Sequence, residues 1–269
     1  MLIVDTDPAL GLRFRDIDDV LAILTLYAHG VPVVGLTTCF GNAPIDQTHP
    51  IGLALGRRLG IPVYRGAAHP GDIDTAAVEA LCAHTGDVLA IGPCTNIAAA
   101  LNRGARWRRL VLLGGTIRTP PNIRYLRLTE LNFALDPAAA NRAFSADIPV
   151  TLIPMEVCRT VVFTGADLQH LPPDLRAASS SWLSIAPLLT RTKGFHPWDV
   201  VAAFVLIDPS MFRCATHSYQ VLGGRFDAGH LAPGPHRVEV VERVDVERLR
   251  GQFREGLRRH EAIPPFTPP

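Results

Sequence analysis

The stretch LIVDTDPALGLRFRDIDDVLAIL, residues 2–24, joins a short apolar run to an apolar helical run through a set of acidic residues. These acidic residues are Asp5, Asp7, Asp16, Asp18 and Asp19. An Asp at a helix start is stabilised by the helix dipole, which accounts for one or two of them. Five carboxylates gathered where a strand meets a helix repel one another and lose hydration unless a cation lies among them. The stretch therefore indicates a site for a hard divalent cation, which prefers oxygen ligands.

The composition indicates one large α/β domain. The chain has 269 residues, of which 48% are hydrophobic, and a formal net charge of +1. This length is enough for a substantial buried core. The near-neutral charge gives no electrostatic footprint for nucleic acid or a membrane surface, and no apolar run is long enough to span a bilayer. We therefore expect no nucleic-acid or membrane partner.

The cysteines point to a reducing compartment. They are odd in number, scattered and without a CxxC pair, at Cys39, Cys82, Cys94, Cys158 and Cys214. We interpret them as small core residues, with neither a disulfide framework nor a zinc site. The chain also begins directly with a strand and lacks the pattern of a secretory signal peptide. We expect a cytoplasmic protein.

Apolar runs and helical stretches alternate through the first half of the chain. The runs expected to be strands are residues 2–4, 33–36, 63–64, 88–91, 110–113 and 150–153. The helices expected between them are residues 20–28, 47–59, 95–101 and 137–144. Continuously apolar strands are buried on both faces, which predicts a parallel sheet wound by right-handed βαβ units. In such a sheet, ligands bind beyond the carboxyl ends of the strands.

The second half predicts more helix and a different sheet edge. We expect helices at 173–189, 200–206 and 246–258, the last with Asp245 as its N-cap, and strands near 219–222 and 237–241. The fold class is therefore α/β, a single domain over residues 1–262 whose parallel sheet has a mixed edge. The proline-rich residues 263–269 are expected to be a surface tail.

Four further blocks follow the acidic cluster. They are TTCFGN at 37–42, IGPCTNIA at 91–98, ELNFALDP at 130–137 and HPWD at 196–199. Together with Asp5-Thr6-Asp7-Pro8 and Asp18-Asp19, a stretched form of DxDPGxDD, they resemble in type and order the calcium-dependent nucleoside hydrolases, also called the inosine-uridine preferring nucleoside hydrolase family. The resemblance covers most of the chain. It implies a Rossmann-like nucleoside hydrolase fold and an enzyme that hydrolyses the N-glycosidic bond of a ribonucleoside or related N-ribosyl compound, releasing base and ribose.

The resemblance also implies roles for individual residues. A Ca²⁺ ion would be held by Asp7, Asp19, Asp199 and the backbone carbonyl of Ile91. The ribose hydroxyls would be held by Asp18, Asn42, Glu130 and Asn132. A metal lowers the pKa of the attacking water, Asp7 would take its proton, and the carboxylates would stabilise the cationic sugar. The expected partner is a small nucleoside, and family members suggest a homodimer or homotetramer.

The chain departs from the family pattern beside the last acidic residue. The family has a His immediately before the metal-binding Asp, whereas this chain has Trp198 there and His196 two positions before Trp198. His196 is either the acid that protonates the leaving base or a structural residue. Trp198 either stacks on the base or packs in the core. The family's long loop after the strand near residue 63 is also shortened, and its His69 and His84 are interpreted as surface residues.

Two segments bear on the mouth of the expected site. The inserted segment, residues 9–17, carries Arg13 and Arg15. We interpret it as a solvated loop with Asp16 as a surface partner of these arginines; the alternative is that they contact a phosphate or carboxylate on an unusual substrate. Residues 118–127 are either a lid over the base or an ordinary surface crossing.

Two other functions fit part of the pattern. One is a nucleoside- or sugar-binding protein of the same fold that kept the metal site and lost turnover. The other is a haloacid-dehalogenase-like phosphatase, which would use the first Asp as nucleophile, a nearby Mg²⁺ and Lys193 to neutralise phosphate. The phosphatase leaves Asn42 and the blocks at 91–98 and 130–137 without a role.

Overall fold

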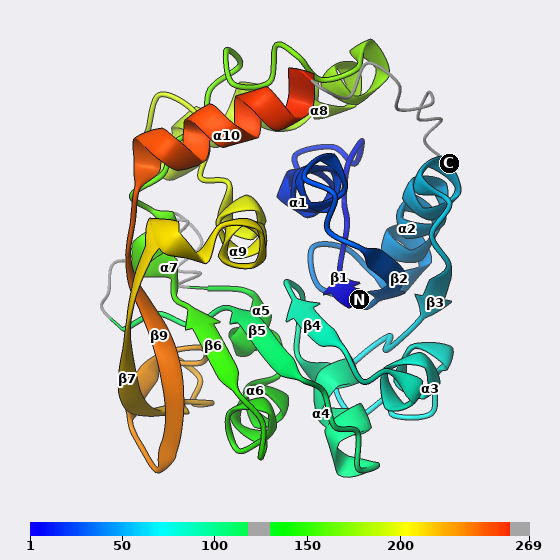
Figure 1. The fold of residues 1–269 in the computed structure, drawn as a ribbon, viewed down its shortest axis with the longest axis vertical. Coiled ribbons are helices and arrows are strands. Elements are labelled where there is room, and N and C mark those ends of the chain that lie inside the picture. The colour runs from blue at the N-terminus through cyan, green and yellow to red at the C-terminus, as the bar shows by residue number, and fades with distance from the viewer. Residues whose placement is uncertain (118–129, 259–269) are drawn as a thin grey trace.

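The computed structural model describes residues 1–117 and 130–258, and within these residues nine strands form one sheet (Figure 1). The strands are β1 (Leu2–Thr6), β2 (Val33–Thr38), β3 (Val63–Arg65), β4 (Asp87–Ala90), β5 (Arg109–Leu113), β6 (Val150–Ile153), β7 (Phe212–Val221), β8 (Leu231–Pro233) and β9 (His236–Val244). Their order is β3-β2-β1-β4-β5-β6-β9-β7-β8. The first seven strands in this order run parallel, whereas β7 pairs antiparallel with β9 and β8. The expected parallel sheet with a mixed edge is confirmed.

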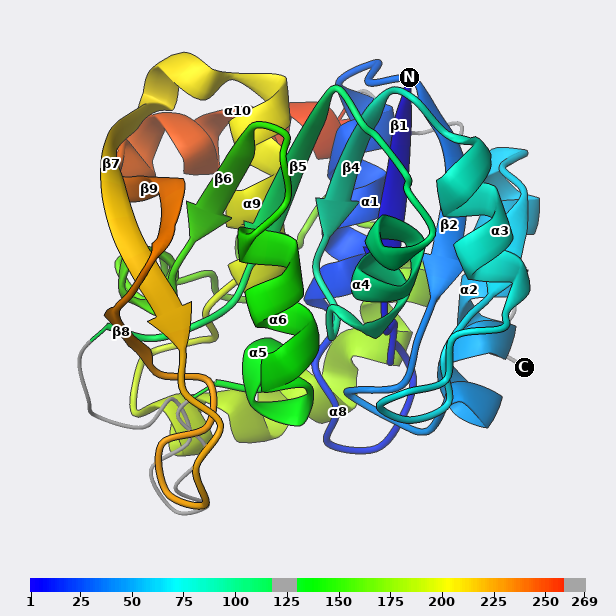
Figure 2. The same cartoon turned by 90° about the horizontal axis from the view of Figure 1, so that it is seen from below.

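The helices cover both faces of the sheet. They are α1 (Asp18–Ala28), α2 (Ile45–Leu59), α3 (Ala76–Ala83), α4 (Thr95–Asn102), α5 (Asn132–Leu135), α6 (Pro137–Phe144), α7 (Met155–Cys158), α8 (Pro173–Thr190), α9 (Trp198–Ile207) and α10 (Val246–Arg258), with a 3₁₀ turn at Pro209–Met211. One face packs against α1, α2, α8, α9 and α10, and the other against α3, α4 and α6 (Figures 1 and 2). Helix α1 lies beside α9 on the same face of the sheet and also contacts α10 (Figure 1). Its residues 18–26 are all buried, which explains why the sequence there is apolar on every side.

The chain reverses its direction of growth across the sheet between β1 and β4. From β1 it adds β2 and β3 on one side, and then returns to add β4, β5 and β6 on the other. The registers Asp5–Thr37 and Asp5–Ala90 place the ends of β2 and β4 beside the end of β1. Such a switch point opens a crevice at the carboxyl ends of the strands. The fold therefore directs attention to the residues that follow β1, β2 and β4.

Several elements differ from the sequence expectation. Residues 66–85, expected as a loop, contain α3, whose N-cap Thr75 accepts the N–H of Val78 at 3.3 Å. Strand β7 is longer than the expected residues 219–222. Exposed and half-buried residues alternate along most of it, so it lacks the continuous apolar run from which the other strands were predicted. Helix α10 has the expected bounds, and the Asp245 side chain accepts the N–H of Arg248 at 3.1 Å, which confirms the N-cap. Residues 118–127, 259–262 and 263–269, for which a lid, the domain's end and a tail are expected, lie outside the described residues.

The structure also shows the state of the cysteines and whether any described helix could cross a membrane. All five cysteines are free thiols, and Cys39, Cys94 and Cys158 are buried as expected. Cys214 is exposed, because it lies on β7 near the sheet edge. None of the described helices is long and apolar enough to cross a membrane.

Helix α10 is expected to contribute to stability through its apolar face. Phe253 is 1% exposed, and its ring centroid lies 4.5 Å from that of Phe163. Phe253→Ala should lower the free energy of unfolding by about 3–5 kcal/mol, measured by urea denaturation, because it leaves a cavity. The matched control is Phe226→Ala, since Phe226 is 83% exposed and its loss should change stability by less than about 0.5 kcal/mol. Equal effects of the two substitutions would contradict this packing.

Candidate active site

Strand β1 and helix α1 bring two pairs of carboxylates together at the switch point. Asp5 and Asp7 lie at the end of β1, and Asp18 and Asp19 form the first turn of α1. The Oδ1 atom of Asp19 accepts hydrogen bonds from the Thr6 hydroxyl and from the Asp7 N–H, the latter at 3.1 Å. Because these bonds join the strand to the helix, the sequence motif fixes the relative position of its own carboxylates.

The loop after β2 holds Asp7 from the other side. The Asn42 N–H donates to Asp7 Oδ2 at 2.6 Å, and the Asn42 side-chain amide donates to Asp19 Oδ2 at 3.2 Å. A Cβ atom at Gly41 would lie 1.9 Å from Asp7 Oδ2, so only glycine allows this approach. The Oδ1 atom of Asp7 is buried and has no hydrogen-bond partner among the described residues.

Helix α9 adds a carboxylate from far along the chain. Asp199 lies in its first turn, and the Asp199 N–H donates to Asp18 Oδ2 at 3.2 Å. The two residues are 181 positions apart and meet because α9 packs against α1. The structure thus brings Asp199 to the carboxylates of the N-terminal motif.

Behind the cluster, Asp5 is held by neutral donors. Its Oδ1 accepts the Thr37 hydroxyl at 2.6 Å and the Asn96 amide at 2.8 Å. Burial nevertheless raises the pKa of Asp5 from 3.8 to about 7. Asn96 was not predicted as a site residue, although it lies in the block at 91–98 that follows a strand, which was the available signal.

The electrostatics of the cluster favour a bound cation. Burial raises the pKa of four carboxyls in the cluster, those of Asp7, Asp18, Asp19 and Asp199. For Asp18 the pKa rises to about 7. Repulsion from neighbouring carboxylates raises the pKa further at all of them except Asp19. One carboxylate oxygen from each of Asp16, Asp18 and Asp19 lies within 4.8 Å of the others. An all-oxygen donor set, together with the unpartnered Asp7 Oδ1, fits a hard divalent ion. The ion would replace the protons that these carboxyls otherwise retain.

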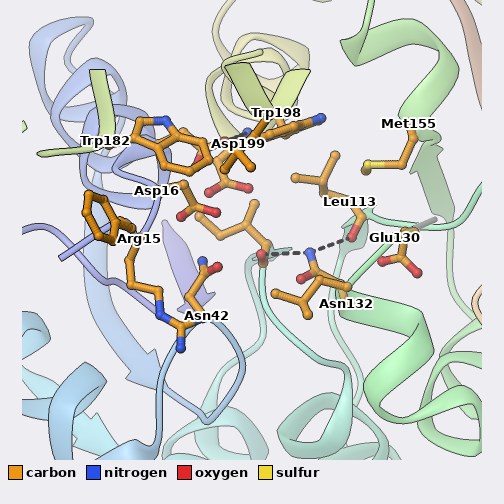
Figure 3. Close-up of a pocket in the computed structure, with 15 residues that line it drawn as sticks. Arg15, Asp16, Asn42, Leu113, Glu130, Asn132, Met155, Trp182, Trp198 and Asp199 are labelled. Carbon is orange, nitrogen blue, oxygen red and sulfur yellow. Dashed lines mark hydrogen bonds between the residues drawn. The ribbon is translucent and has the colours of Figure 1, made fainter. Parts of the chain in front are cut away.

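A cavity of about 210 Å³ opens over this cluster (Figure 3). Its lining contains seven of the residues that the sequence predicts for the site, namely Asp18, Asn42, Ile91, Glu130, Asn132, Trp198 and Asp199. Asp7 and Asp19 lie beneath them and contact the cavity wall through Asn42. The structure therefore brings together the predicted metal-binding and sugar-binding residues.

Asn132 and Glu130 form the opposite wall. The Asn132 side-chain amide donates to the carbonyls of Ile91 at 2.8 Å and Leu113 at 3.1 Å, which leaves its Oδ1 to accept from a ligand hydroxyl (Figure 3). Glu130 accepts the N–H groups of Phe133 and Ala134 at 2.8 and 3.1 Å. Burial still raises the pKa of Glu130 from 4.5 to about 7.

His196 is not among the described residues that line the cavity. It is 7% exposed, and its Nδ1 lies 2.8 Å from the Val161 carbonyl, to which it donates. Burial lowers the pKa of His196, which favours the neutral ring. This arrangement favours the structural alternative over the leaving-group acid. Trp198 lines the cavity while 9% exposed, so it both packs in the core and faces the ligand space.

The inserted segment is a loop whose residues 13–15 are exposed, as expected, but its two ends are buried and it borders the cavity. Phe14, Arg15 and Asp16 line the cavity, and the Phe14 N–H donates to Ser181 Oγ of α8 at 2.9 Å. Asp16 is half-buried beside Asp18 and Asp19, and its Oδ1 has no partner among the described residues, so the expectation of a surface partner for the arginines is wrong. Asp16 thus belongs to the carboxylate cluster, as the acidic stretch of the sequence indicated.

Helix α8 supplies two lining residues that the sequence did not reveal, Trp182 and Leu189. On an amphipathic helix they are indistinguishable from core residues. His69 is exposed as expected, whereas His84 is half-buried and bonds the Asp87 carbonyl at 2.9 Å. Lys193 is exposed and is not among the described lining residues, so it offers no phosphate site here.

Comparison with known proteins identifies the fold and the family. The model of the inosine-uridine preferring nucleoside hydrolases matches residues 2–251. This chain belongs to that family. It is therefore an N-ribosyl hydrolase, an enzyme class that cleaves the N-glycosidic bond of ribonucleosides, and the resemblance seen in the sequence is confirmed. The phosphatase alternative is excluded.

Two curated relatives show how far the sequence has diverged from other family members. Probable uridine nucleosidase 2 of Oryza sativa subsp. japonica is 28% identical, over 80% of this chain and 74% of that protein. The pyrimidine-specific ribonucleoside hydrolase RihB of Escherichia coli O157:H7 is 27% identical, over 61% of this chain and 62% of that protein. The matches thus cover 62–74% of the length of these relatives.

Solved structures share the fold. A plant nucleoside hydrolase, the PpNRh1 enzyme, superposes with a TM-score of 0.81 at 24% identity, covering 95% of this chain and 98% of that one. A purine-preferring ribonucleoside hydrolase from Gardnerella vaginalis gives a TM-score of 0.77 at 23% identity, covering 96% of this chain and 98% of that one. The nucleoside hydrolase fold is therefore confirmed.

The raised carboxyl pKa values predict a pH-dependent stability that a divalent ion reverses. Asp5, Asp18 and Glu130 have pKa values of about 7 in the fold, against 3.8, 3.8 and 4.5. The folded protein therefore binds more protons than the unfolded chain between these values, and its stability falls as the pH rises from about 4 to about 7. In chelator, Tm by calorimetry should be lower at pH 8 than at pH 5. Excess Ca²⁺ should raise Tm more at pH 8, where protons compete less; an equal rise at both values would contradict the argument.

Proposed function

We propose that this protein binds a ribonucleoside in the cavity over the carboxylate cluster and hydrolyses it with a water held beside Asp7, releasing base and ribose. The observation that carries the proposal is that Asn42, which holds Asp7, lines one wall of the cavity, while Asn132 lines the other. The wall with carboxylates suits a sugar that becomes cationic as the bond breaks. Uridine is the first candidate substrate, because two curated relatives are named for uridine or pyrimidine nucleosides.

The metal is proposed to be Ca²⁺, held by Asp7, Asp19, Asp199 and the Ile91 carbonyl. When bound, the ion supplies positive charge that lowers the pKa of a water and orients sugar hydroxyls. The Ile91 carbonyl already accepts the Asn132 amide, and a carbonyl oxygen has a second lone pair for another partner. The extended, oxygen-only donor set supports calcium, which accepts more ligands in looser geometry than magnesium does.

Asp7 is proposed as the general base. Its Oδ2 accepts the Asn42 N–H, so the side chain is fixed. A carboxylate oxygen has two lone pairs, so the unpartnered Oδ1 would face the ion with one and take the water's proton with the other. Asp18 and Asn42 would bind ribose hydroxyls near the cluster, and Asn132 would accept one through Oδ1. Glu130 would bind the sugar at the far end of the cavity, and Trp198 would pack against the nucleoside. For His196 we retain only a structural role.

The oligomeric state and location are also proposals. A homodimer or homotetramer is proposed from the resemblance to the family. A cytoplasmic location is proposed from the free, scattered cysteines.

The test of the function is the release of ribose from purine and pyrimidine nucleosides and p-nitrophenyl riboside, and of ribose 5-phosphate from the 5′-monophosphates, with and without chelator. We expect turnover that is fastest on uridine among the natural nucleosides and that chelator abolishes. Silence on the whole panel while Ca²⁺ still binds by calorimetry would overturn the proposal and indicate a nucleoside-binding protein instead.

Asp7→Asn should lower kcat by about 10²–10⁴-fold, because it removes the general base, measured by ribose release at saturating Ca²⁺. The matched control is Asp46→Asn, which alters an exposed carboxylate paired with Arg65 and should leave kcat unchanged. Circular dichroism should show the same fold for both variants. Unchanged turnover of Asp7→Asn would refute the assignment.

A further inference from the structure

The inserted segment is held in one conformation at the mouth of the cavity. The Leu12 N–H donates to the Ala9 carbonyl at 3.0 Å, and the Arg15 N–H donates to the Leu12 carbonyl at 3.3 Å. Within the second turn Phe14 has a φ of 61°, a left-handed conformation that is rare for a bulky residue. The bond from its N–H to Ser181 Oγ ties this strained residue to α8. Backbone strain maintained by surrounding contacts is a feature of functional sites, and here it sets the position of the next residue, Arg15.

Arg15 brings a positive charge to an otherwise acidic cavity. Among the described residues that line it, Arg15 is the single cationic one, beside four carboxylates, Asp16, Asp18, Glu130 and Asp199. In the part of the chain that the structure describes, its guanidinium forms no ion pair. The neighbouring Arg13 instead packs over the Phe14 ring, at 4.6 Å from its centroid, and does not line the cavity. The charge of Arg15 is therefore available to a ligand.

The position of Arg15 identifies the part of the ligand that it meets. Figure 3 shows Arg15 on the side of Asn42 and Trp182, with Glu130 on the far side of Asn132. In the proposed reaction, water attacks the anomeric carbon beside Asp7, which Asn42 contacts. The water attacks the face of that carbon opposite the base, so the base points away from Asp7. The aromatic side chains of Phe14 and Trp182 line the cavity on the side of Arg15 and suit a planar base, whereas Glu130 and Asn132 offer oxygen atoms to sugar hydroxyls. The base is therefore placed at the Arg15 end and the sugar toward Glu130.

The departing base needs a partner for its negative charge. When the C1′–N bond breaks, its electron pair passes to the base, while the water oxygen bonds to C1′ and Asp7 takes the water's proton. No described residue that lines the cavity is a His, Lys or Tyr. A guanidinium donates several hydrogen bonds and keeps its proton, so it stabilises an anion without transferring a proton.

We propose that Arg15 binds the nucleobase and stabilises the negative charge that develops on it as it leaves, favouring a base with a carbonyl oxygen beside the glycosidic nitrogen, as in uracil. The base takes its proton from solvent after the bond has broken. The inference rests on the proposed function, and it assigns the inserted segment the task that the adjacent His performs in the family pattern.

The experiment compares Arg15→Ala and Arg15→Lys with the parent on uridine, uridine 5′-monophosphate and p-nitrophenyl riboside, whose leaving group needs little help. Arg15→Ala should lower kcat/KM for uridine by about 10–100-fold, mostly in kcat, because the interaction strengthens as charge develops. Arg15→Ala should lower kcat/KM for p-nitrophenyl riboside by less than about threefold, because its leaving group needs less stabilisation of negative charge. Arg15→Lys should keep more of the parental rate on uridine than Arg15→Ala does, since lysine keeps the charge but lacks the planar pair of donors.

Arg13→Ala is the matched control and should retain parental rates on all three substrates. Parental Tm and Ca²⁺ affinity in Arg15→Ala would show that the fold and the metal site are intact. Equal losses on uridine and p-nitrophenyl riboside would overturn the inference and leave the hydrolase function standing. A loss confined to the 5′-monophosphate would overturn it in favour of phosphate binding. A parent inactive on all three substrates would overturn the proposed function and this inference together.

Discussion

The mutual repulsion of buried carboxylates is the constraint on which the rest of this structure depends. Asp7, Asp18, Asp19 and Asp199 lie together in the interior, and burial raises the pKa of each. Such a cluster costs stability, so the fold supplies it with fixed donors: the Thr6 hydroxyl and the N–H groups of Asp7, Asn42 and Asp199. The remaining charge is what a divalent cation offsets. Activity and stability are therefore linked through one group of side chains.

The sheet brings the carboxylates and the groups that surround them to one edge, although they come from distant parts of the chain. The switch point between β1 and β4 separates the strand ends and leaves space for a ligand. Helix α9 packs on α1 and delivers Asp199, while Asn132 joins the ends of β4 and β5 through the carbonyls of Ile91 and Leu113. The reacting groups thus lie at the ends of well-packed elements, which fixes their geometry.

The base end of the cavity is built differently. Its lining comes from the inserted segment and from α8, through Arg15 and Trp182, and the two are joined by the Phe14–Ser181 hydrogen bond. Loops and peripheral helices tolerate change more readily than the sheet does, so they are where members of one family diverge in specificity. The metal and sugar end of the cavity, in contrast, is held by the strands and by α1 and α9.

The parallel sheet, most helices and the residues proposed to bind the metal and the sugar could be predicted from the sequence, because buried strands are continuously apolar and because the acidic and amide motifs lie directly after them in the chain. Asp7, Asn42 and Asn132 were recognisable for this reason. The tertiary structure was needed to show that His196 is not among the described residues that line the cavity, and that Phe14 and Trp182 are among them. These outcomes depend on how α8 and α9 pack and on how the inserted segment folds back, and contacts between residues so far apart in the chain leave no local pattern in the sequence.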